Sequence, residues 1–330
     1  MDHIVSKPHD RLALTLSDDM ASVNSLIRLR MASEHAPRIP EVTAHLVDAG
    51  GKRLRPMLTL AAAQMCGYTG PYHIHLAATV EFIHTATLLH DDVVDESAQR
   101  RGRQTANLLW DNQSSVLVGD YLFSRAFQLM VETGNLRVLD ILANASATIA
   151  EGEVLQLSAA QDLKTTEEVY FKVIRGKTAA LFAAAMEVGA VIAEQDEKTV
   201  QALSDYGDAL GISFQIVDDL LDYTGTDTTG KNIGDDFREC KLTLPVIKAV
   251  DAADGDELAF WQKCIGKGKQ DEGDLEHALT LMYAHNTLQD TRTQALFWAD
   301  KAKKTLDVMP EHALKTMLMD LSDYVVARLN

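Results

Sequence analysis

Apolar side chains recur at intervals of three and four positions along much of the chain. The pattern runs from Leu76 to Val94, from Ser115 to Met130 and from Leu142 to Leu157. This spacing is typical of helices that pack one face against a common core. Ala, Leu, Glu and Gln are abundant, only seven prolines are present, and we see no strong strand signal. The pattern therefore predicts an all-α protein.

Glycine-rich breaks separate these segments, and none resembles a long flexible linker. They fall at Gly50 and Gly51, near Gly67–Pro71, at Gly102, near Gly134 and around Gly225–Gly234. The stretch from Asp254 to Gly273 is expected to be a variable surface excursion between helices. We find no tandem repeat, so we predict one domain over residues 1–330.

Composition narrows the class of protein. The formal net charge of −17 argues against a nucleic-acid partner, which would need clustered Lys and Arg. The three cysteines are widely spaced, which predicts neither a disulfide framework nor a zinc site and fits a reducing cytoplasm. The N-terminus lacks the apolar core of a signal peptide, and the most apolar stretch, Thr178–Ala193, carries Glu187 and is short for a membrane span. A cytoplasmic protein without a transmembrane segment is expected.

Two acidic clusters stand out from this background. In LLHDDVVDE, Asp91 and Asp95 are four positions apart and project from one helix face, with Asp92 between them. A single DDxxD pattern is equally compatible with an acidic, solvent-exposed turn. A second copy occurs in FQIVDDLLDYTG, and its carboxylates belong to Asp218, Asp219 and Asp222.

The apolar flanks of both clusters indicate helices that pack into the core, so the carboxylates need a cation. All-oxygen ligands favour magnesium over zinc. If the two helices face each other, the carboxylates would hold several Mg²⁺ ions around a diphosphate, because magnesium usually binds through carboxylates and substrate phosphates together.

Basic residues lie close to these motifs in the sequence. GGKRLRP offers Lys52, Arg53 and Arg55 after a glycine turn, and RRGRQTAN offers Arg100 and Arg101. Arginine can grip diphosphate oxygens with two parallel hydrogen bonds. Each group taken alone is also compatible with a solvated basic turn.

Five ordered motifs carry a family resemblance: GKRLRP, HTATLLHDDVVDESAQRRGRQTAN, RGKTAAL, FQIVDDLLD and GKNIGDDFRECKLTLP. Together they resemble the trans-polyprenyl diphosphate synthases over residues 45–250. The resemblance implies the isoprenoid synthase fold, a helical bundle around a deep central cavity, usually in a homodimer. It also implies a magnesium-dependent prenyltransferase that joins isopentenyl diphosphate to an allylic diphosphate.

The resemblance assigns roles to individual residues of this sequence. It implies that isopentenyl diphosphate is held by Lys52, Arg55, His84 and Arg101. It implies that the allylic diphosphate is contacted by Arg100, Lys177 and Lys241. Thr178 and Gln215 match residues beside the reacting carbons. The resemblance also implies that Lys231 belongs to a Gly- and Thr-rich loop able to close over the site.

Two positions depart from the family pattern. Cys240 stands where Gly is usual, which puts the placement of Lys241 in doubt, and Gln104 stands where Pro is common. An inert thiol at Cys240 is favoured over a redox role.

Product length is predicted from the position five residues before the first Asp, which limits the chain in the family when it is aromatic. Here it is Ala86, with Thr87 beside it and Ile83 one turn further away. Without a bulky ring, the growing chain can descend between helices, which predicts an octaprenyl to decaprenyl product for a quinone side chain. The alternative is that Ala86 only lets two helices approach each other, with a farnesyl or geranylgeranyl product.

Other classes explain fewer motifs. A helical phosphohydrolase would use His90 and Asp91, but it leaves the second DDxxD and GKRLRP unexplained. A terpene cyclase would generally have a mixed pattern in place of the second cluster. A non-catalytic subunit would commonly have lost one cluster, whereas both are intact. Transient contact with a membrane, for release of an apolar product, is compatible with this interpretation.

Overall fold

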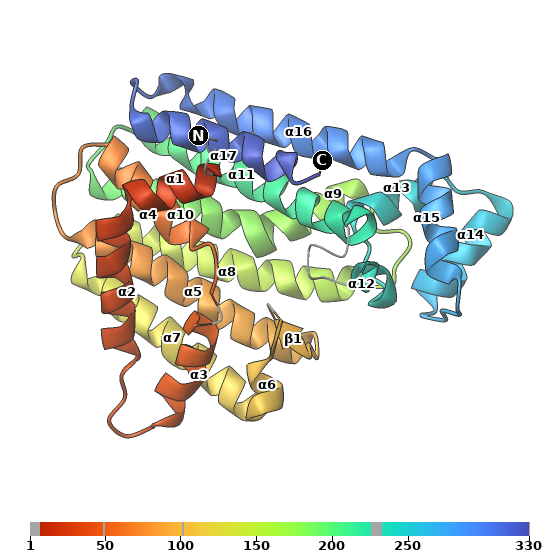
Figure 1. Cartoon of the computed structure of the whole chain (residues 1–330), viewed down its shortest axis with the longest axis horizontal. Helices are drawn as coiled ribbons and strands as arrows, with labels where there is room; N and C mark the ends of the chain where they lie inside the picture. The colour runs from red at the N-terminus through yellow and green to blue at the C-terminus, as the bar shows by residue number, and fades with distance from the viewer. Residues whose placement is uncertain (1–6, 49, 101, 226–232, 330) are drawn as a thin grey trace, which may run out of the picture. The chain divides into compact units, whose positions relative to one another are not determined.

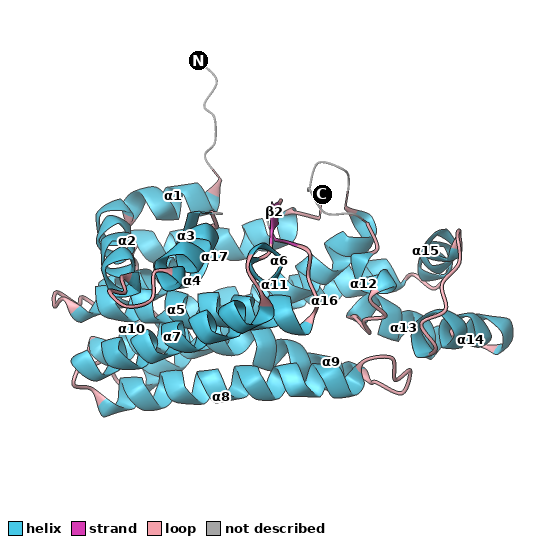
Figure 2. Cartoon of the chain, turned by 90° about the horizontal axis from the view of Figure 1, so that it is seen from below, coloured by secondary structure: helices cyan, strands magenta, loops and turns pink. Residues whose placement is uncertain are grey.

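A computed structural model of the chain describes residues 7–48, 50–100, 102–225 and 233–329. Helices dominate these residues, as Figure 1 and Figure 2 show, which confirms the predicted all-α class. Contacts divide the chain into two compact units that are each discontinuous in sequence. Unit 1 comprises Met1–Ser146, Leu181–Gly207 and Val308–Leu318, and unit 2 comprises Ala147–Ala180, Asp208–Asp307 and Met319–Asn330. A single domain over residues 1–330 stays a prediction.

Unit 1 contains the helix that carries the first acidic cluster and the helices before and after it. They are α1 (Pro8–Thr15), α2 (Ser17–Met31), α3 (Arg38–Asp48), α4 (Leu54–Met65), α5 (Tyr72–Val94), α6 (Ala106–Leu109) and α7 (Asn112–Glu132). Unit 1 also includes α8 (Leu136–Ala159) up to Ser146 and α10 (Ala180–Ile192) from Leu181. It includes α11 (Glu197–Thr224) up to Gly207 and α17 (Ala313–Ala327) up to Leu318.

Helix α5 forms the centre of unit 1. It packs against α7, α4 and α2, and Figure 1 shows α5 and α7 side by side. The apolar positions that predicted this helix are buried, among them Leu76, Val80 and Ile83, all fully shielded from solvent. Helix α7 begins after Asp111, whose side chain accepts a hydrogen bond from the backbone N–H of Ser114 at 2.5 Å and so caps the helix.

Small residues let α4 and α10 approach closely. A Cβ at Gly189 of α10 would lie 2.6 Å from the Cβ of Ala62 and 2.8 Å from the carbonyl oxygen of Thr59 on α4. Ala61, Ala62 and Ala63 are fully buried. Close backbone contact between these helices therefore depends on glycine and alanine at the crossing.

A short hairpin follows α5, although the sequence showed no strand signal. Strands β1 (Gln99–Arg100) and β2 (Arg103–Gln104) pair antiparallel, with Gln99 opposite Gln104. His45 of α3 holds the second strand, because its Nε2 lies 2.8 Å from the carbonyl oxygen of Gln104. A tertiary contact thus supports strands too short to show periodicity.

Unit 2 contains the helices that carry and surround the second acidic cluster. They are α9 (Glu167–Ile174), a π-helical turn (Arg175–Ala179), α12 (Asp235–Arg238), α13 (Leu244–Ala252), α14 (Gly255–Trp261), α15 (Asp274–Ala284) and α16 (Thr287–Thr305), with the remaining parts of α8, α11 and α17. Helix α13 packs against α9, α15 and α16. Helix α11 is tied to α16 by Ser213, whose hydroxyl donates to the carbonyl oxygen of Ala295 at 2.9 Å.

The expected surface excursion over Asp254–Gly273 was partly wrong. Helix α14 and a second π-helical turn (Gln262–Gly266) occupy most of it, and Trp261, Cys264 and Ile265 are fully buried. Phe237 packs edge-on against Trp261, with 6.5 Å between ring centroids. No helix within the described residues is both long and apolar enough to cross a bilayer.

Candidate active site

The first acidic cluster lies at the C-terminal end of α5 in unit 1. Asp91 and Asp92 belong to the last helical turn, and Asp95 is the residue directly after the helix. Asp95 is exposed and Asp91 half-buried, whereas Asp92 is fully shielded from solvent. The three carboxylates therefore occupy different environments despite their shared motif.

Asp92 is held by two residues that follow it in the chain. Its Oδ1 accepts hydrogen bonds from Nε of Arg100 at 2.8 Å and is 2.7 Å from Nη2 of the same side chain. Its backbone carbonyl accepts from the amide of Asn107 at 3.2 Å. Burial raises the pKa of Asp92, and the hydrogen bond and charge of Arg100 oppose that rise. Arg100 thus stabilises the buried carboxylate and anchors β1 to α5.

Two residues predicted to bind isopentenyl diphosphate lie next to each other in unit 1. Arg55 is in the first turn of α4, and its Nη1 lies 3.3 Å from Nε2 of His84 on α5. The Arg55 guanidinium also stacks over the ring of buried Phe182 at 4.4 Å. This contact occupies the face of the guanidinium plane. Lys52 is exposed just before α4, and Arg101 lies outside the described residues.

The second acidic cluster lies on α11 in unit 2. Asp219 is buried, and its two carboxylate oxygens have separate donors. The hydroxyl of Tyr170 on α9 donates to Oδ2 at 2.6 Å, and the amide of Gln215 donates to Oδ1 at 2.7 Å. Burial, followed by the charge of Asp219, raises the pKa of Tyr170 well above its usual value. The phenol therefore stays protonated and acts as a donor.

Asp222 and Asp218 have other surroundings. Asp222 is buried, and its carboxylate oxygens accept from the backbone N–H groups of Asp235 and Asp236 at 3.2 and 3.1 Å. Asp218 is half-exposed and lies 3.9 Å from Nη2 of Arg328. Asp222 thus holds the start of α12.

Lys177 lies in the π-helical turn that follows α9. Its ammonium group is 2.9 Å from Oε2 of Glu153 and donates to the side-chain oxygen of Gln156 at 2.9 Å. A Cβ at Gly152 would lie 2.7 Å from the backbone nitrogen of Lys177, so this part of α8 directly contacts the turn. Single π-helical turns are frequent at functional sites because they reorient side chains.

Thr178 and Gln215 are brought together, although 37 positions separate them. The Thr178 hydroxyl donates to the side-chain oxygen of Gln215 at 2.8 Å. Because the amide of Gln215 also donates to Asp219, a continuous hydrogen-bonded chain links Thr178, Gln215, Asp219 and Tyr170. These residues hold one another in defined rotamers.

Lys241 follows Cys240, which has a left-handed φ of 55°. The Lys241 ammonium is 2.5 Å from Oε2 of Glu239. Gln270 braces this loop, because its amide donates to the carbonyl oxygens of Phe237 at 2.7 Å and Cys264 at 3.2 Å. The Cys240 thiol is buried, and burial raises its pKa, which agrees with the expected inert thiol. Lys231 lies outside the described residues.

The donor chemistry of the two clusters fits magnesium. Asp92 Oδ2 is buried and accepts no hydrogen bond from any described residue, as expected of a carboxylate oxygen with capacity for a further partner. Within the described residues, no three His, Cys, Asp or Glu side chains gather as a preformed metal cage. Magnesium commonly binds through one or two carboxylates plus substrate phosphates, so a cage is not needed.

The predicted chain-length residues occupy the middle of α5. Ala86 and Ile83 are fully buried, and Thr87 is half-buried with its hydroxyl donating to the carbonyl oxygen of His84 at 2.9 Å. A larger side chain at Ala86 would therefore displace neighbouring protein or ligand atoms rather than solvent.

Sequence reasoning missed two side chains that support the acidic clusters. Tyr170 precedes the RGKTAAL motif and donates to Asp219, and Asn107 is the last residue of the RRGRQTAN motif. No spacing rule connects Tyr170 with a residue 49 positions later. Asn107 could have been suspected from its place within a motif.

Comparison with known proteins gives concordant results. The family model of polyprenyl synthetases matches residues 36–282. Octaprenyl diphosphate synthase of Escherichia coli K12 is 44% identical over 313 residues, which cover 94% of this chain and 96% of the relative. A geranyl-diphosphate-specific all-trans-nonaprenyl-diphosphate synthase of Rhodobacter capsulatus is 40% identical and is covered over 96% of its length. The crystal structure of a decaprenyl diphosphate synthase from Rhodobacter capsulatus has a TM-score of 0.95 and 71% identity, covering 98% of this chain and 99% of that one.

A helical fold that carries two DDxxD clusters, together with the family match over residues 36–282, identifies a prenyltransferase. The chain belongs to the polyprenyl synthetase family.

Proposed function

We propose that this protein extends an allylic diphosphate with successive isopentenyl diphosphates to a long all-trans polyprenyl diphosphate of octaprenyl to decaprenyl length. The observation that carries the proposal is the similarity to long-chain synthases over almost the whole chain, with both acidic clusters present. The named products of these relatives differ by one or two isoprene units, so the proposal covers that range. A quinone side chain would be the use of such a product.

Isopentenyl diphosphate is assigned to the basic residues of unit 1. Lys52, Arg55 and His84 are the proposed ligands, with Arg101 completing the set. The adjacency of Arg55 and His84 supports this assignment, because a guanidinium and an imidazole 3.3 Å apart can grip one diphosphate. Stacking on the Phe182 ring helps to fix the orientation of the Arg55 guanidinium.

The allylic diphosphate is assigned to Arg100, Lys177 and Lys241, with Lys231 as a further proposed contact. Each of the first three has a carboxylate partner: Asp92, Glu153 and Glu239. These pairs hold the cations in place before a diphosphate arrives, so less side-chain entropy is lost on binding. The pairs must loosen, or share their cations, when the more highly charged diphosphate binds.

Magnesium is the proposed cofactor, held by Asp91, Asp92 and Asp95 and by Asp218, Asp219 and Asp222. When bound, it would neutralise charge on the leaving diphosphate. The protein's own residues contribute orientation: Tyr170 and Gln215 fix the carboxylate of Asp219, and Arg100 fixes that of Asp92.

Thr178 and Gln215 are proposed to lie beside the reacting carbons. The Thr178 hydroxyl is already committed as a donor to Gln215, so its lone pairs rather than its proton face other neighbours. An oxygen held in this way can stabilise nearby positive charge without being poised for attack. Loss of the final proton to the released diphosphate needs no protein base.

The defining experiment incubates the purified protein with Mg²⁺, farnesyl diphosphate and labelled isopentenyl diphosphate, and separates the dephosphorylated products by length. Products of octaprenyl to decaprenyl length are expected. Farnesyl or geranylgeranyl products would retain the class and refute the length. No incorporation would instead indicate a subunit that depends on a partner.

Ala86 is the proposed determinant of product length. Ala86→Phe should truncate the product, and Ala86→Val should shorten it less, because Ala86 is fully buried and a larger side chain there would push into the path proposed for the growing chain. Thermal unfolding of both variants controls for damage to the buried helix. Unchanged product length in folded Ala86→Phe would refute the assignment.

We further propose a cytoplasmic homodimer that contacts a membrane only transiently, to release its apolar product. Exposed apolar side chains on α7 support the dimer, among them Leu117, Phe127 and Val131, of which Leu117 is 66% exposed. Leu117→Glu should yield a monomer by light scattering after size-exclusion chromatography. Leu296→Glu, at an exposed position of α16, is the matched control and should leave the dimer intact.

A further inference from the structure

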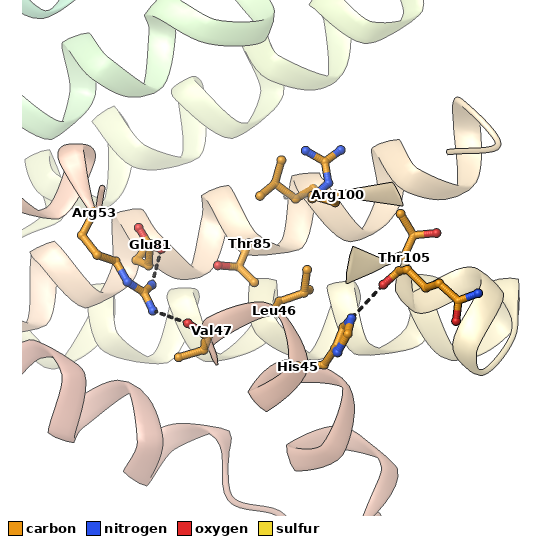
Figure 3. Close-up of a pocket in the computed structure, with 10 residues that line it drawn as sticks. His45, Leu46, Val47, Arg53, Glu81, Thr85, Arg100 and Thr105 are labelled. Atoms are coloured by element: carbon orange, nitrogen blue, oxygen red, sulfur yellow. Dashed lines mark hydrogen bonds and ion pairs between the residues drawn. The ribbon is translucent and has the colours of Figure 1, made fainter. Parts of the chain in front are cut away.

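The three cations of GGKRLRP have different surroundings in unit 1. Arg55 lies beside His84 and Lys52 is exposed, whereas Arg53 points to a carboxylate on a neighbouring helix. Figure 3 shows the Arg53 guanidinium bridging Glu81 of α5 and the end of α3. The side chains of Arg53 and Glu81 are only 16% and 11% exposed, so the pair is largely dry.

Two contacts fix Arg53. Its Nη1 makes an ion pair and hydrogen bond with Oε1 of Glu81, and its Nη2 donates to the carbonyl oxygen of Val47 at 3.4 Å. A single guanidinium therefore joins the last turn of α3, the start of α4 and the middle of α5. Arginine suits this role because its donors form a rigid, planar fork.

The backbone at Arg53 also needs support. Arg53 immediately precedes α4 and has a left-handed conformation, with φ of 47° and ψ of 35°. Non-glycine residues rarely adopt this region, and they persist there only when surrounding contacts hold them. The bridge to Glu81 and Val47 supplies such contacts, and the carbonyl of Arg53 accepts the hydrogen bond from Met57 at 3.2 Å that opens the helix.

We propose that Arg53 and Glu81 are positioning residues for isopentenyl diphosphate, and that neither binds it. The inference rests on the proposed function, because Lys52 and Arg55 are the ligands it assigns to this substrate. Arg53 sits between them in the chain, so the left-handed backbone that the bridge holds at Arg53 sets the directions in which Lys52 and Arg55 leave the main chain. Glu81 acts through Arg53 and lies on the same helix as His84, one turn away.

The pocket in Figure 3 places this bridge beside the hairpin. Arg53, Glu81 and Thr85 line it together with Arg100 and Thr105. Both guanidinium groups in the pocket already have carboxylate partners, Glu81 for Arg53 and Asp92 for Arg100. The Arg53 bridge thus joins α3, α4 and α5, and Glu81 directs its guanidinium toward α5, as expected of a positioning residue.

A double-mutant cycle separates positioning from direct binding. The variants are Arg53→Met, Glu81→Gln and their combination, with Arg53→Lys as the conservative change. Initial rates give kcat and the KM for each substrate, and thermal unfolding gives Tm. Glu81→Gln should raise the KM for isopentenyl diphosphate by about 10- to 100-fold, the cost of a displacement near 1 Å, with a much smaller change for the allylic substrate.

The combined variant should resemble Arg53→Met, because either change alone already breaks the bridge. Arg53→Lys should recover part of the KM, and Tm should show the same non-additivity as the kinetics. The exposed ion pair of Arg137 and Glu197 gives the control, and Arg137→Met should leave both KM values unchanged. Should Arg53→Met not fold, Glu81→Gln and Arg53→Lys still carry the comparison.

Direct binding by Arg53 predicts a different result. Glu81→Gln would then leave the KM for isopentenyl diphosphate unchanged or lower it, because the guanidinium would be released toward the anion, and this outcome overturns the inference. Equal rises in both KM values would also overturn it. A wild-type protein that incorporates no isopentenyl diphosphate would refute the proposed function, whereas an active wild type with an unaffected Glu81→Gln variant refutes the inference alone.

Discussion

Tyr170 offers a direct test of how the second acidic cluster is held. Its hydroxyl lies 2.6 Å from Oδ2 of Asp219, and both side chains are buried. Tyr170→Phe removes this donor and leaves the ring volume almost unchanged. A hydrogen bond to a charged group contributes about 1.5–3 kcal/mol, so the change should lower the free energy of unfolding by roughly that amount.

The effect on activity should exceed the effect on folding alone. Asp219 would keep its bond from Gln215 on one oxygen and could rotate about it. If the bond energy is lost equally in the transition state, kcat should fall by about ten- to a hundredfold, because each 1.4 kcal/mol corresponds to a factor of ten. The Mg²⁺ concentration for half-maximal rate should rise, since a less ordered carboxylate is a poorer ligand.

Tyr206 provides the matched control. It is fully buried in unit 1, and its hydroxyl donates to the carbonyl oxygen of Leu318 at 2.8 Å. Tyr206→Phe removes one buried hydroxyl, as Tyr170→Phe does, but touches no acidic cluster. Urea unfolding should register a loss in both variants, while only Tyr170→Phe should change the rate and the Mg²⁺ requirement. A Tyr170→Phe enzyme with wild-type rate and Mg²⁺ dependence would refute the role assigned to this phenol.

Two further predictions concern stability. Burial raises the pKa of Glu187 above its usual value, and the hydrogen bond from Ser204 opposes that rise, so folding makes ionisation of this carboxyl less favourable. The contribution of Glu187 to stability is present below its unfolded pKa near 4.5 and is lost as pH rises through the folded pKa. Glu187→Gln does not ionise, so its free energy of unfolding relative to wild type should rise as pH increases from 4.5, as measured by urea unfolding. A constant difference above this pH would contradict the assignment. Gly189→Ala should destabilise unit 1, because the added Cβ would lie 2.6 Å from the Cβ of Ala62. Overpacking costs about 1–3 kcal/mol, whereas the gain in helix propensity is roughly 1 kcal/mol. A Tm above that of the wild type would show that α4 and α10 can separate without cost.

Helix positions were accessible from sequence because burial imposes periodicity. The patterns from Leu76 to Val94 and from Ser115 to Met130 correspond to α5 (Tyr72–Val94) and α7 (Asn112–Glu132). The hairpin of β1 and β2 left no such trace. Its strands have two residues each, and His45 stabilises β2 from a helix more than fifty positions earlier. Likewise, charge and polarity in the Asp254–Gly273 stretch concealed the buried Trp261.

The motifs identified the residue types of the site, but not the partners of each residue. Lys52, Arg53 and Arg55 are equivalent as a string of cations in the sequence. Only the structure shows that Arg55 contacts His84, whereas Arg53 pairs with Glu81. Glu81 itself lies among apolar neighbours on α5, where a helical pattern predicts only core. Pairings between distant positions require tertiary structure, because local spacing carries no information about them.

Asp92 of the first cluster and Asp219 of the second are held by different kinds of donor. Arg100 places two nitrogens within hydrogen-bonding distance of one oxygen of Asp92, so most of the charge of this buried carboxylate is already balanced. Tyr170 and Gln215 are uncharged, and they orient the carboxylate of Asp219 through hydrogen bonds. The ion pair with Arg100 therefore gives Asp92 a second task beside the proposed magnesium binding, which is to hold Arg100 and the hairpin against α5.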